Sequence, residues 1–336
     1  MKRYLFLLIG VIGVSVILSS CAINVFKALN TPTNTVALSQ IAIDEANSGN
    51  FKEALSNSVQ VLTTISTGTI PSTNVYNAVV TSDTSTSSRN TLASLTNFLN
   101  TTTSTSVALK NVSEAMLNSI SCSMGLNALT LASSFISFYN QSQSVSVSSV
   151  STPDYTLIFS AIKLLVSSSH NIQLMQLLEA LSGTLNRIDP SNSNWLISEG
   201  MYSTLQIPII LFDSNGNGVL DPQDQIFNYL WNYQTNTFKS QLTPQEYNGI
   251  MYNVQLQTYE NIQKSNQVIS DLSTALSDFD AGLLDMIQSS SDPQTTQTLT
   301  TLRSYVDQLQ MAMYVVTAQT ISQVQYLGDI QNYINF

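Results

Sequence analysis

The sequence predicts an all-α protein, and three observations lead to this class. Apolar residues recur at intervals of three and four along most of the chain, which is the spacing of one helix face. The last hundred residues carry the longest such patterns, on both sides of a turn near 290–293. The segment that alternates like a strand, residues 141–152, has no evident partner strand and precedes Pro153. We therefore expect a multi-helix bundle or irregular helical array with a long C-terminal antiparallel helical hairpin.

Composition limits both the surface and the partners of this protein. Hydrophobic residues make up 43% of the 336 residues, which is enough for a buried core. Charged residues make up only 10%, against about 25% in typical soluble domains, so most of the surface must be neutral and polar. The formal net charge is −10. Because the sequence has no basic block, we expect no binding to nucleic acid.

The N-terminal residues have the order of a bacterial export signal. A basic start at residues 1–3 precedes an apolar run at 4–18, which is short for a membrane span, and then Leu18-Ser-Ser-Cys21. This order resembles the signal peptide and lipobox of bacterial lipoproteins. The resemblance implies that Cys21 is acylated, as by palmitate, and that the lipid anchors the chain to a membrane. The alternative is an uncleaved signal anchor that ends at a chance cysteine.

The same resemblance sets the expected location. A lipid on Cys21 would place the chain in the cell envelope, outside the cytoplasm. The residue after the cysteine is Ala22 rather than Asp, which resembles outer-membrane sorting if the source has two membranes. The predicted organisation is a signal peptide (1–20), acylated cysteine and tether (21–33), helical domain (34–205), loop region (206–233) and long hairpin (243–334).

The helical domain begins with a predicted helix hairpin at residues 35–66. Ala46 ends its first helix, Gly49 makes the turn, and Phe51 and Ala54 begin its second helix. This run resembles one tetratricopeptide repeat, and an unrelated hairpin is the alternative because no second copy follows. Further helices are predicted at 90–99, 107–139 with a break near Gly125, 154–185 interrupted at His170, and 190–206, where Pro208 is expected to end the last of them.

The long hairpin is predicted from a start signal and two regular apolar patterns. Thr243-Pro-Gln-Glu246 has the form of a capping box with proline at the first helical position, and Asp292-Pro293 begins the second arm. Each arm has about 40 residues, or about 60 Å of helix. An extended antiparallel pair and a kinked pair folded into a compact bundle both remain open.

One loop carries oxygen-bearing side chains at a diagnostic spacing. In residues 213–224, potential ligands occupy loop positions 1, 3, 5, 7, 9 and 12, and Gly218 occupies position 6: Asp213, Asn215, Asn217, the Val219 carbonyl, Asp221 and Asp224. The loop resembles the calcium loop of EF-hand proteins and half of a dockerin module. The resemblance implies a single Ca²⁺ site, with Leu211-Phe212 and 225–230 as flanks of an entering and a leaving helix.

Three features of the loop predict a weak and structural site. Position 12 is Asp224 rather than Glu, two ligands are neutral amides, and no second loop is present to pair through Leu220. A dissociation constant of about 10⁻⁴ to 10⁻³ M would still fill such a site outside a cell. A metal-free turn and another bound cation are the alternatives.

No pattern in the sequence indicates catalysis. His170 is the only histidine, and no nucleophile elbow, phosphate loop or zinc-protease motif occurs. Cys122 falls in an apolar run and is expected to be a small buried residue. We therefore expect a lipoprotein that binds or scaffolds other envelope proteins and is not an enzyme. A solute- or peptide-binding transport component using Trp195 and Trp231 is the first alternative, and an enzyme of unidentified type is the second. The sequence specifies no oligomeric state.

Overall fold

The computed structural model describes residues 34–66, 85–124, 126, 171–259 and 262–293, with further single residues or pairs at 79, 163, 166–167 and between 296 and 310. Within these residues the chain is mostly helical and its strands form one two-stranded hairpin, which confirms the all-α class. Cys21, the segment 141–152 and His170 lie outside the described residues.

The chain divides into two compact units. Unit 1 comprises residues 1–130, 173–202 and 278–303, and unit 2 comprises residues 131–172, 203–277 and 304–336. Helices α10 (Asn194–Phe212) and α13 (Ile262–Ser289) each contribute several residues to both units.

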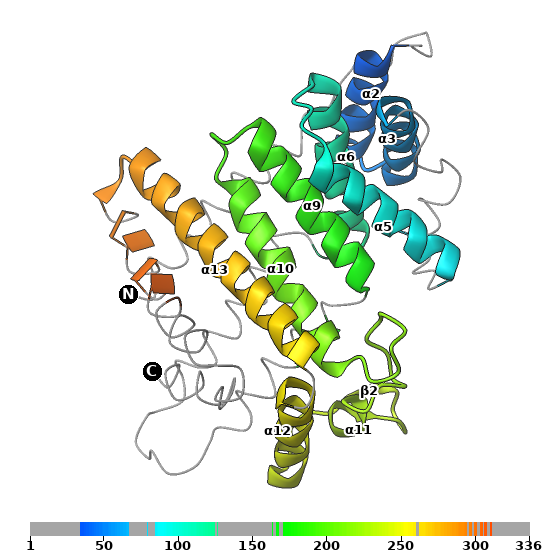
Figure 1. The fold of residues 1–336 in the computed structure, drawn as a ribbon, viewed down its shortest axis with the longest axis vertical. Coiled ribbons are helices and arrows are strands. Elements are labelled where there is room, and N and C mark those ends of the chain that lie inside the picture. The colour runs from blue at the N-terminus through cyan, green and yellow to red at the C-terminus, as the bar shows by residue number, and fades with distance from the viewer. Residues whose placement is uncertain are drawn as a thin grey trace. The chain divides into compact units, whose positions relative to one another are not determined.

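The first helices of unit 1 pack through small side chains. Helices α2 (Thr35–Asn47), α3 (Phe51–Ile65) and α6 (Val107–Ser123) lie against one another (Figure 1). A cluster of buried alanines lies at their contact: Ala42, Ala46, Ala54 and Ala115. Alanine lets helix backbones approach closely without loss of helix propensity. The predicted helix hairpin at 35–66 is confirmed, and α6 covers one of its faces.

Helices α5 (Thr86–Thr101) and α9 (Ile172–Ile188) complete the described helical part of unit 1 with the shared helices. Helix α5 begins before the predicted residue 90 because the Ser85 hydroxyl accepts the Ser88 N–H at 3.3 Å and caps the helix. Arg187 Nη2 on α9 donates to the Leu99 carbonyl at 3.2 Å, which joins α9 to α5.

The expectation that Cys122 is buried is wrong. Its side chain is exposed at the end of α6, whereas Met116 and Ile120 of the same helix are fully buried. Cys122 lies in the last turn of α6, where Ser123 is also exposed and Met124 is only half-buried. The buried part of the helix therefore ends at Ser121, although the apolar pattern of the sequence continues past it.

The expectation that Pro208 ends a helix is also wrong. Helix α10 runs without a break from Asn194 to Phe212, with Pro208 inside it. Proline removes one N–H donor from the helix interior, but the apolar residues Leu205, Ile209 and Leu211 around it are buried. Their burial offsets the missing hydrogen bond, so the entering helix reaches the loop intact.

The segment after the loop 213–224 does not form the predicted leaving helix. Helix α11 (Phe227–Leu230) is a single turn, and strands β1 (Trp231–Asn232) and β2 (Thr237–Phe238) follow as an antiparallel hairpin with Trp231 opposite Phe238. The rings of Trp231 and Phe238 pack edge to face with centroids 4.9 Å apart, and Phe227 lies 5.8 Å from Trp231. This aromatic cluster explains why the chain turns here instead of extending a helix.

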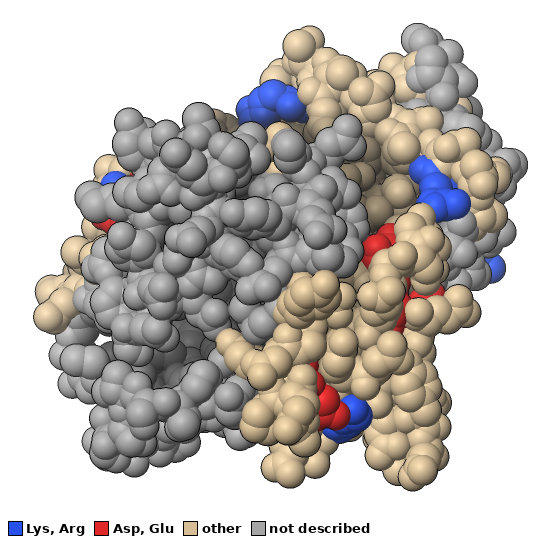
Figure 2. All heavy atoms as spheres, turned by 60° about the horizontal axis from the view of Figure 1, so that its bottom comes forward, with Lys and Arg blue, Asp and Glu red and all other residues tan. Residues whose placement is uncertain are grey.

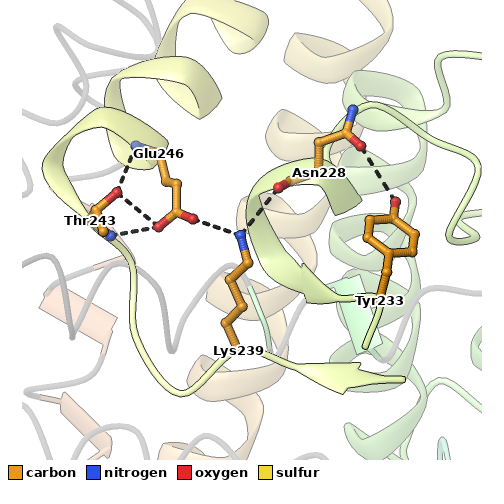
Figure 3. A network of polar contacts seen from close by, with 5 residues as sticks. All are labelled: Asn228, Tyr233, Lys239, Thr243 and Glu246. Carbon is orange, nitrogen blue, oxygen red and sulfur yellow. Dashed lines mark hydrogen bonds and ion pairs between the residues drawn. The ribbon is translucent and has the colours of Figure 1, made fainter. Parts of the chain in front are cut away.

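The capping box at Thr243 is confirmed. Helix α12 (Pro244–Tyr259) begins where the Thr243 N–H donates to Glu246 Oε2 at 2.7 Å and the Glu246 N–H donates to Thr243 Oγ1 at 3.3 Å. Lys239 Nζ adds an ion pair with Glu246 Oε1 at 2.6 Å and donates to the Asn228 carbonyl at 3.2 Å (Figure 3). The network joins α11 to the start of α12.

The first arm of the long hairpin consists of two helices, α12 and α13, rather than one of about 40 residues. The second arm is described in part and pairs with α13 in antiparallel order. Arg303 Nε donates to Asp280 Oδ1 at 2.5 Å, and Gln310 Nε2 donates to the Leu276 carbonyl at 3.1 Å.

The surface agrees with the composition. On the face in Figure 2, charged side chains of the described residues form small separate groups with neutral surface between them. Ion pairs between described residues include Lys110–Asp189, Lys239–Glu246 and Arg303–Asp280. Side chains in the described part of the chain therefore interact with water chiefly through neutral groups.

Candidate calcium loop

Buried residues hold the loop at both of its ends. The Asp213 N–H donates to the Ile209 carbonyl at 2.9 Å, so the loop begins on the last turn of α10. Leu220 inside the loop and Ile226 and Phe227 after it are buried in unit 2. These apolar contacts fix both ends, so the polar side chains between them have defined positions.

Asp213 organises the first half of the loop. Its Oδ1 accepts the N–H groups of Gly216 at 2.7 Å and Asn217 at 3.2 Å, and its Oδ2 accepts the Gly218 N–H at 2.7 Å. Gly216 and Gly218 have φ values of +73° and +78°, which other residues adopt only with strain. The sequence indicated this requirement for Gly218 and missed it for Gly216.

The two asparagines and Asp221 turn the backbone locally. Asn215 Oδ1 accepts the Asn217 N–H at 2.9 Å, and Asn217 Oδ1 accepts the Val219 N–H at 2.8 Å. Asn217 Nδ2 donates to Asp221 Oδ2 at 3.0 Å, and Asp221 Oδ1 accepts the Gln223 N–H at 2.7 Å. Each predicted side-chain ligand therefore also stabilises the loop backbone, as short polar side chains do in turns.

Asp224 closes the loop. Its side chain has 0% exposure, and its Oδ1 accepts the Ser214 N–H at 2.8 Å and the Asn215 N–H at 3.4 Å, while its Oδ2 accepts the Asp221 N–H at 2.9 Å. Burial raises the pKa of Asp224 and the nearby Asp213 adds to the rise, against the backbone N–H groups that lower it. A buried carboxylate beside a second carboxylate is stabilised by a nearby positive charge.

A segment outside the loop takes the place of a second loop. Asn171 and Val219 form an antiparallel bridge, and the Ile172 N–H donates to the Gly218 carbonyl at 2.9 Å. Leu220, the residue expected to face a paired loop, is 6% exposed. This pairing could not be predicted, because residues 171–172 carry no loop pattern of their own.

Tyr233 ties the end of the loop to the β-hairpin. Its hydroxyl donates to the Pro222 carbonyl at 2.8 Å and lies 3.5 Å from Asn228 Oδ1 (Figure 3). The loop is therefore attached to α10, to residues 171–172 and to the hairpin, all through contacts that remove flexibility from its backbone.

The residues fit Ca²⁺ by donor chemistry. All six predicted ligands offer oxygen, which calcium prefers over nitrogen and sulfur. Among the residues that the structure describes, no Lys or Arg forms an ion pair with Asp213, Asp221 or Asp224. No group of three or more His, Cys, Asp or Glu side chains in the described ranges is placed to share a metal ion. The carboxylates of Asp213 and Asp224 are instead directed at backbone N–H groups.

Comparison of the chain with protein-family models, with curated proteins and with solved structures finds no match. The lipidation site predicted at Cys21 lies outside the described residues. None of the described helices combines the length and the hydropathy that crossing a membrane requires. The loop 213–224 and the sequence pattern at residues 1–21 are therefore the features that bear on function.

Proposed function

We propose that the protein is a lipid-anchored, extracytoplasmic lipoprotein that binds or scaffolds other envelope proteins and contains one structural calcium site. The observation that supports it most is the loop 213–224, in which buried Asp224 lies near Asp213 and no described cation pairs with either carboxylate. Bound Ca²⁺ would supply the positive charge that these carboxylates lack.

A structural role for the ion follows from what the loop contacts. The loop side chains bind the loop backbone, and the loop backbone binds Ile172 and Tyr233. An ion held by the predicted ligands Asp213, Asn215, Asn217, Asp221, Asp224 and the Val219 carbonyl would therefore strengthen the junction of α10 with its neighbours in unit 2.

The anchor supports the same conclusion independently. Acylation of Cys21 would hold the protein outside the cytoplasm, where even a site of about 10⁻³ M affinity is filled. The pattern Leu18-Ser-Ser-Cys21 is the basis of this part of the proposal.

A binding role is supported by the helical surfaces. Val36 on α2 and Val107 on α6 are 48% and 61% exposed, so each leaves apolar area available to another protein. The solute-binding alternative relies on Trp195 and Trp231 as walls of a cleft. Trp231 packs edge to face against Phe227 and Phe238, which is the environment of a packing residue, and we therefore favour the scaffolding role.

Thermal unfolding with and without calcium tests the site. We expect calcium to raise the Tm of the wild-type protein above its value in chelator. The double variant Asp213→Asn, Asp224→Asn keeps acceptor oxygens but loses two charges, and its Tm should not respond to calcium. Glu53→Gln removes an exposed carboxylate on α3 and should keep the full response. An absent wild-type response, or an undiminished response of the double variant, contradicts the calcium site.

Fractionation of cells tests the anchor and the partner. The wild-type protein should carry an acyl group and sediment with membranes, and Cys21→Ser should lose both properties. Cross-linking in intact cells, followed by purification in detergent, should then recover an envelope protein with the wild-type chain. Membrane association that persists without acylation in Cys21→Ser contradicts the lipoprotein assignment.

A further inference from the structure

Three carboxyl groups of unit 1 come from three different helices that pack together: Glu179 on α9, Glu199 on α10 and Asp278 on α13. Two glycines define how closely the helices approach. A Cβ at Gly183 would lie 2.6 Å from Glu199 Oε1, and a Cβ at Gly282 would lie 2.8 Å from Ile197 Cδ1. Helices α9 and α13 therefore both lie directly against the same part of α10 (Figure 1).

The spacing along each helix brings the acids to these contacts. Glu179 precedes Gly183 by four residues and Asp278 precedes Gly282 by four residues, so each acid lies on the same helix face as its glycine. Glu199 lies on α10, two residues after Ile197. Asp278 and Glu179 both act on the charge of Glu199, so the three carboxyl groups lie within electrostatic range of one another.

The groups around Glu199 and Asp278 do not fully compensate their negative charges. The cation that acts on Glu199 is Arg187 of α9, and its guanidinium already donates to the Leu99 carbonyl and the Thr184 hydroxyl. On α13, Asp280 is paired with Arg303. Among the described residues no hydrogen bond reaches Glu199, and the buried Asp278 Oδ2 has no hydrogen-bond partner.

Such an environment favours the neutral carboxylic acid over the carboxylate. Burial raises the pKa of Glu199 to about 8, and Asp278 and Glu179 add to the rise while Arg187 opposes it. Burial raises the pKa of Asp278 to about 7, and Glu179 adds to this rise. In the unfolded chain the same groups ionise at their ordinary values of about 4 to 4.5.

We propose that Glu199 and Asp278, next to Glu179, bind protons in acid and so help hold α9, α10 and α13 together, and that their ionisation in alkali weakens this packing. The three residues lie outside the calcium loop, so the inference does not depend on calcium binding. This titration makes unit 1 a structure that tolerates acidic surroundings and loosens above neutral pH.

The sign of the effect follows from proton linkage. A carboxyl whose pKa is higher in the folded protein contributes stability that is fully present below its ordinary pKa and is lost as the pH rises through the folded value. The window therefore runs from about pH 4 to about pH 8 for Glu199 and to about pH 7 for Asp278. Each group raises the unfolding equilibrium constant by up to about tenfold per pH unit in this window.

Unfolding of the full-length protein at fixed saturating calcium, between about pH 5 and pH 9, tests the inference. The wild-type Tm should fall across this range. Glu199→Gln, which is neutral at every pH, should show a smaller fall and should unfold at a higher temperature than wild type at the alkaline end. Asp278→Asn should behave in the same direction, and Glu53→Gln should follow the wild type.

Titration of the carboxyl groups in the wild-type protein tests the proposal without any substitution. Carbon-13 NMR of the wild-type side-chain carboxyls should give midpoints for Glu199 and Asp278 well above the ordinary range of about 4 to 4.5. Glu114 on α6 also has a pKa raised by burial, so assignment to individual residues is part of the measurement. Midpoints for Glu199 and Asp278 below about pH 5, or a Tm that is flat or rises from acid to alkali, overturn the proposal.

Discussion

Replacing Asp224 by alanine should open the loop 213–224 while the rest of the fold remains. The Asp224 carboxylate is buried and accepts hydrogen bonds from the N–H groups of Ser214, Asn215 and Asp221 and from the Ser214 hydroxyl. Alanine provides no acceptor, so three backbone N–H groups lose their partner at once. Ser214 and Asn215 lie at the start of the loop and Asp221 lies near its end. Without the Asp224 carboxylate, no described side chain connects these two parts of the loop through hydrogen bonds to their N–H groups.

The expected loss can be estimated from these contacts. One unsatisfied buried donor costs about 1–3 kcal/mol. Water can enter a loop that has opened, so we take the lower limit for each of the three groups and expect about 3 kcal/mol in chelator. At a calcium concentration 10 to 100 times a dissociation constant of about 10⁻³ to 10⁻⁴ M, loss of the ion would add about 1.4 to 2.7 kcal/mol.

Hydrogen exchange of the loop amides is the suitable assay because it reports opening locally. In chelator, exchange at Ser214, Asn215 and Asp221 should accelerate by about 100-fold in Asp224→Ala, as about 3 kcal/mol implies. Asp44→Ala, which removes a carboxylate from α2, should leave exchange in the loop unchanged. Loop exchange in Asp224→Ala within about twofold of the wild-type rate would refute the reasoning, since the hydrogen bonds would then contribute almost nothing.

Three further outcomes follow from the described contacts. Gly218→Ala places a Cβ at a φ of +78° and should lower the free energy of unfolding by about 1–2 kcal/mol; urea unfolding measures it, and an unchanged midpoint would contradict the loop conformation. Glu246→Gln removes the charge that pairs with Lys239 and should destabilise the start of α12 by about 1 kcal/mol, seen as faster amide exchange there. The variant Cys21→Ser leaves Cys122 as the only thiol, and Cys122 is exposed. This thiol should react fully with a thiol reagent in the folded protein, and a reaction that requires denaturant would show that Cys122 is buried.

Local chemistry explains which parts of the structure the sequence could predict. The reciprocal hydrogen bonds of Thr243 and Glu246 involve residues three apart, so their pattern is visible in the sequence and the capping box was found. The hairpin at 35–66 was found for a similar reason, since each of its helices carries its own apolar stripe.

The features that sequence reasoning missed depend on side-chain packing and backbone pairing that local sequence patterns do not show. Pro208 lies inside a helix because buried neighbours hold that helix together, and proline alone predicts the opposite. Trp231 turns the chain into a hairpin through its contacts with Phe227 and Phe238. The bridge between Asn171 and Val219 joins residues with no common pattern. In the candidate site, residue types and spacing were predictable, but the hydrogen bonds that occupy the carboxylates were not.

The sparsely charged surface in Figure 2 has a consequence for the kinetics of association. Long-range attraction between opposite charges accelerates encounter of many protein pairs, and dissolved salt removes that acceleration. Where the charges of a surface form small separate groups, long-range electrostatic attraction contributes little to the association rate, so salt has little effect on that rate. A protein that docks on the described neutral surface should therefore associate at the unassisted rate of about 10⁵ to 10⁷ M⁻¹s⁻¹. For a partner without net charge, that rate should stay nearly constant as the ionic strength of the surroundings changes.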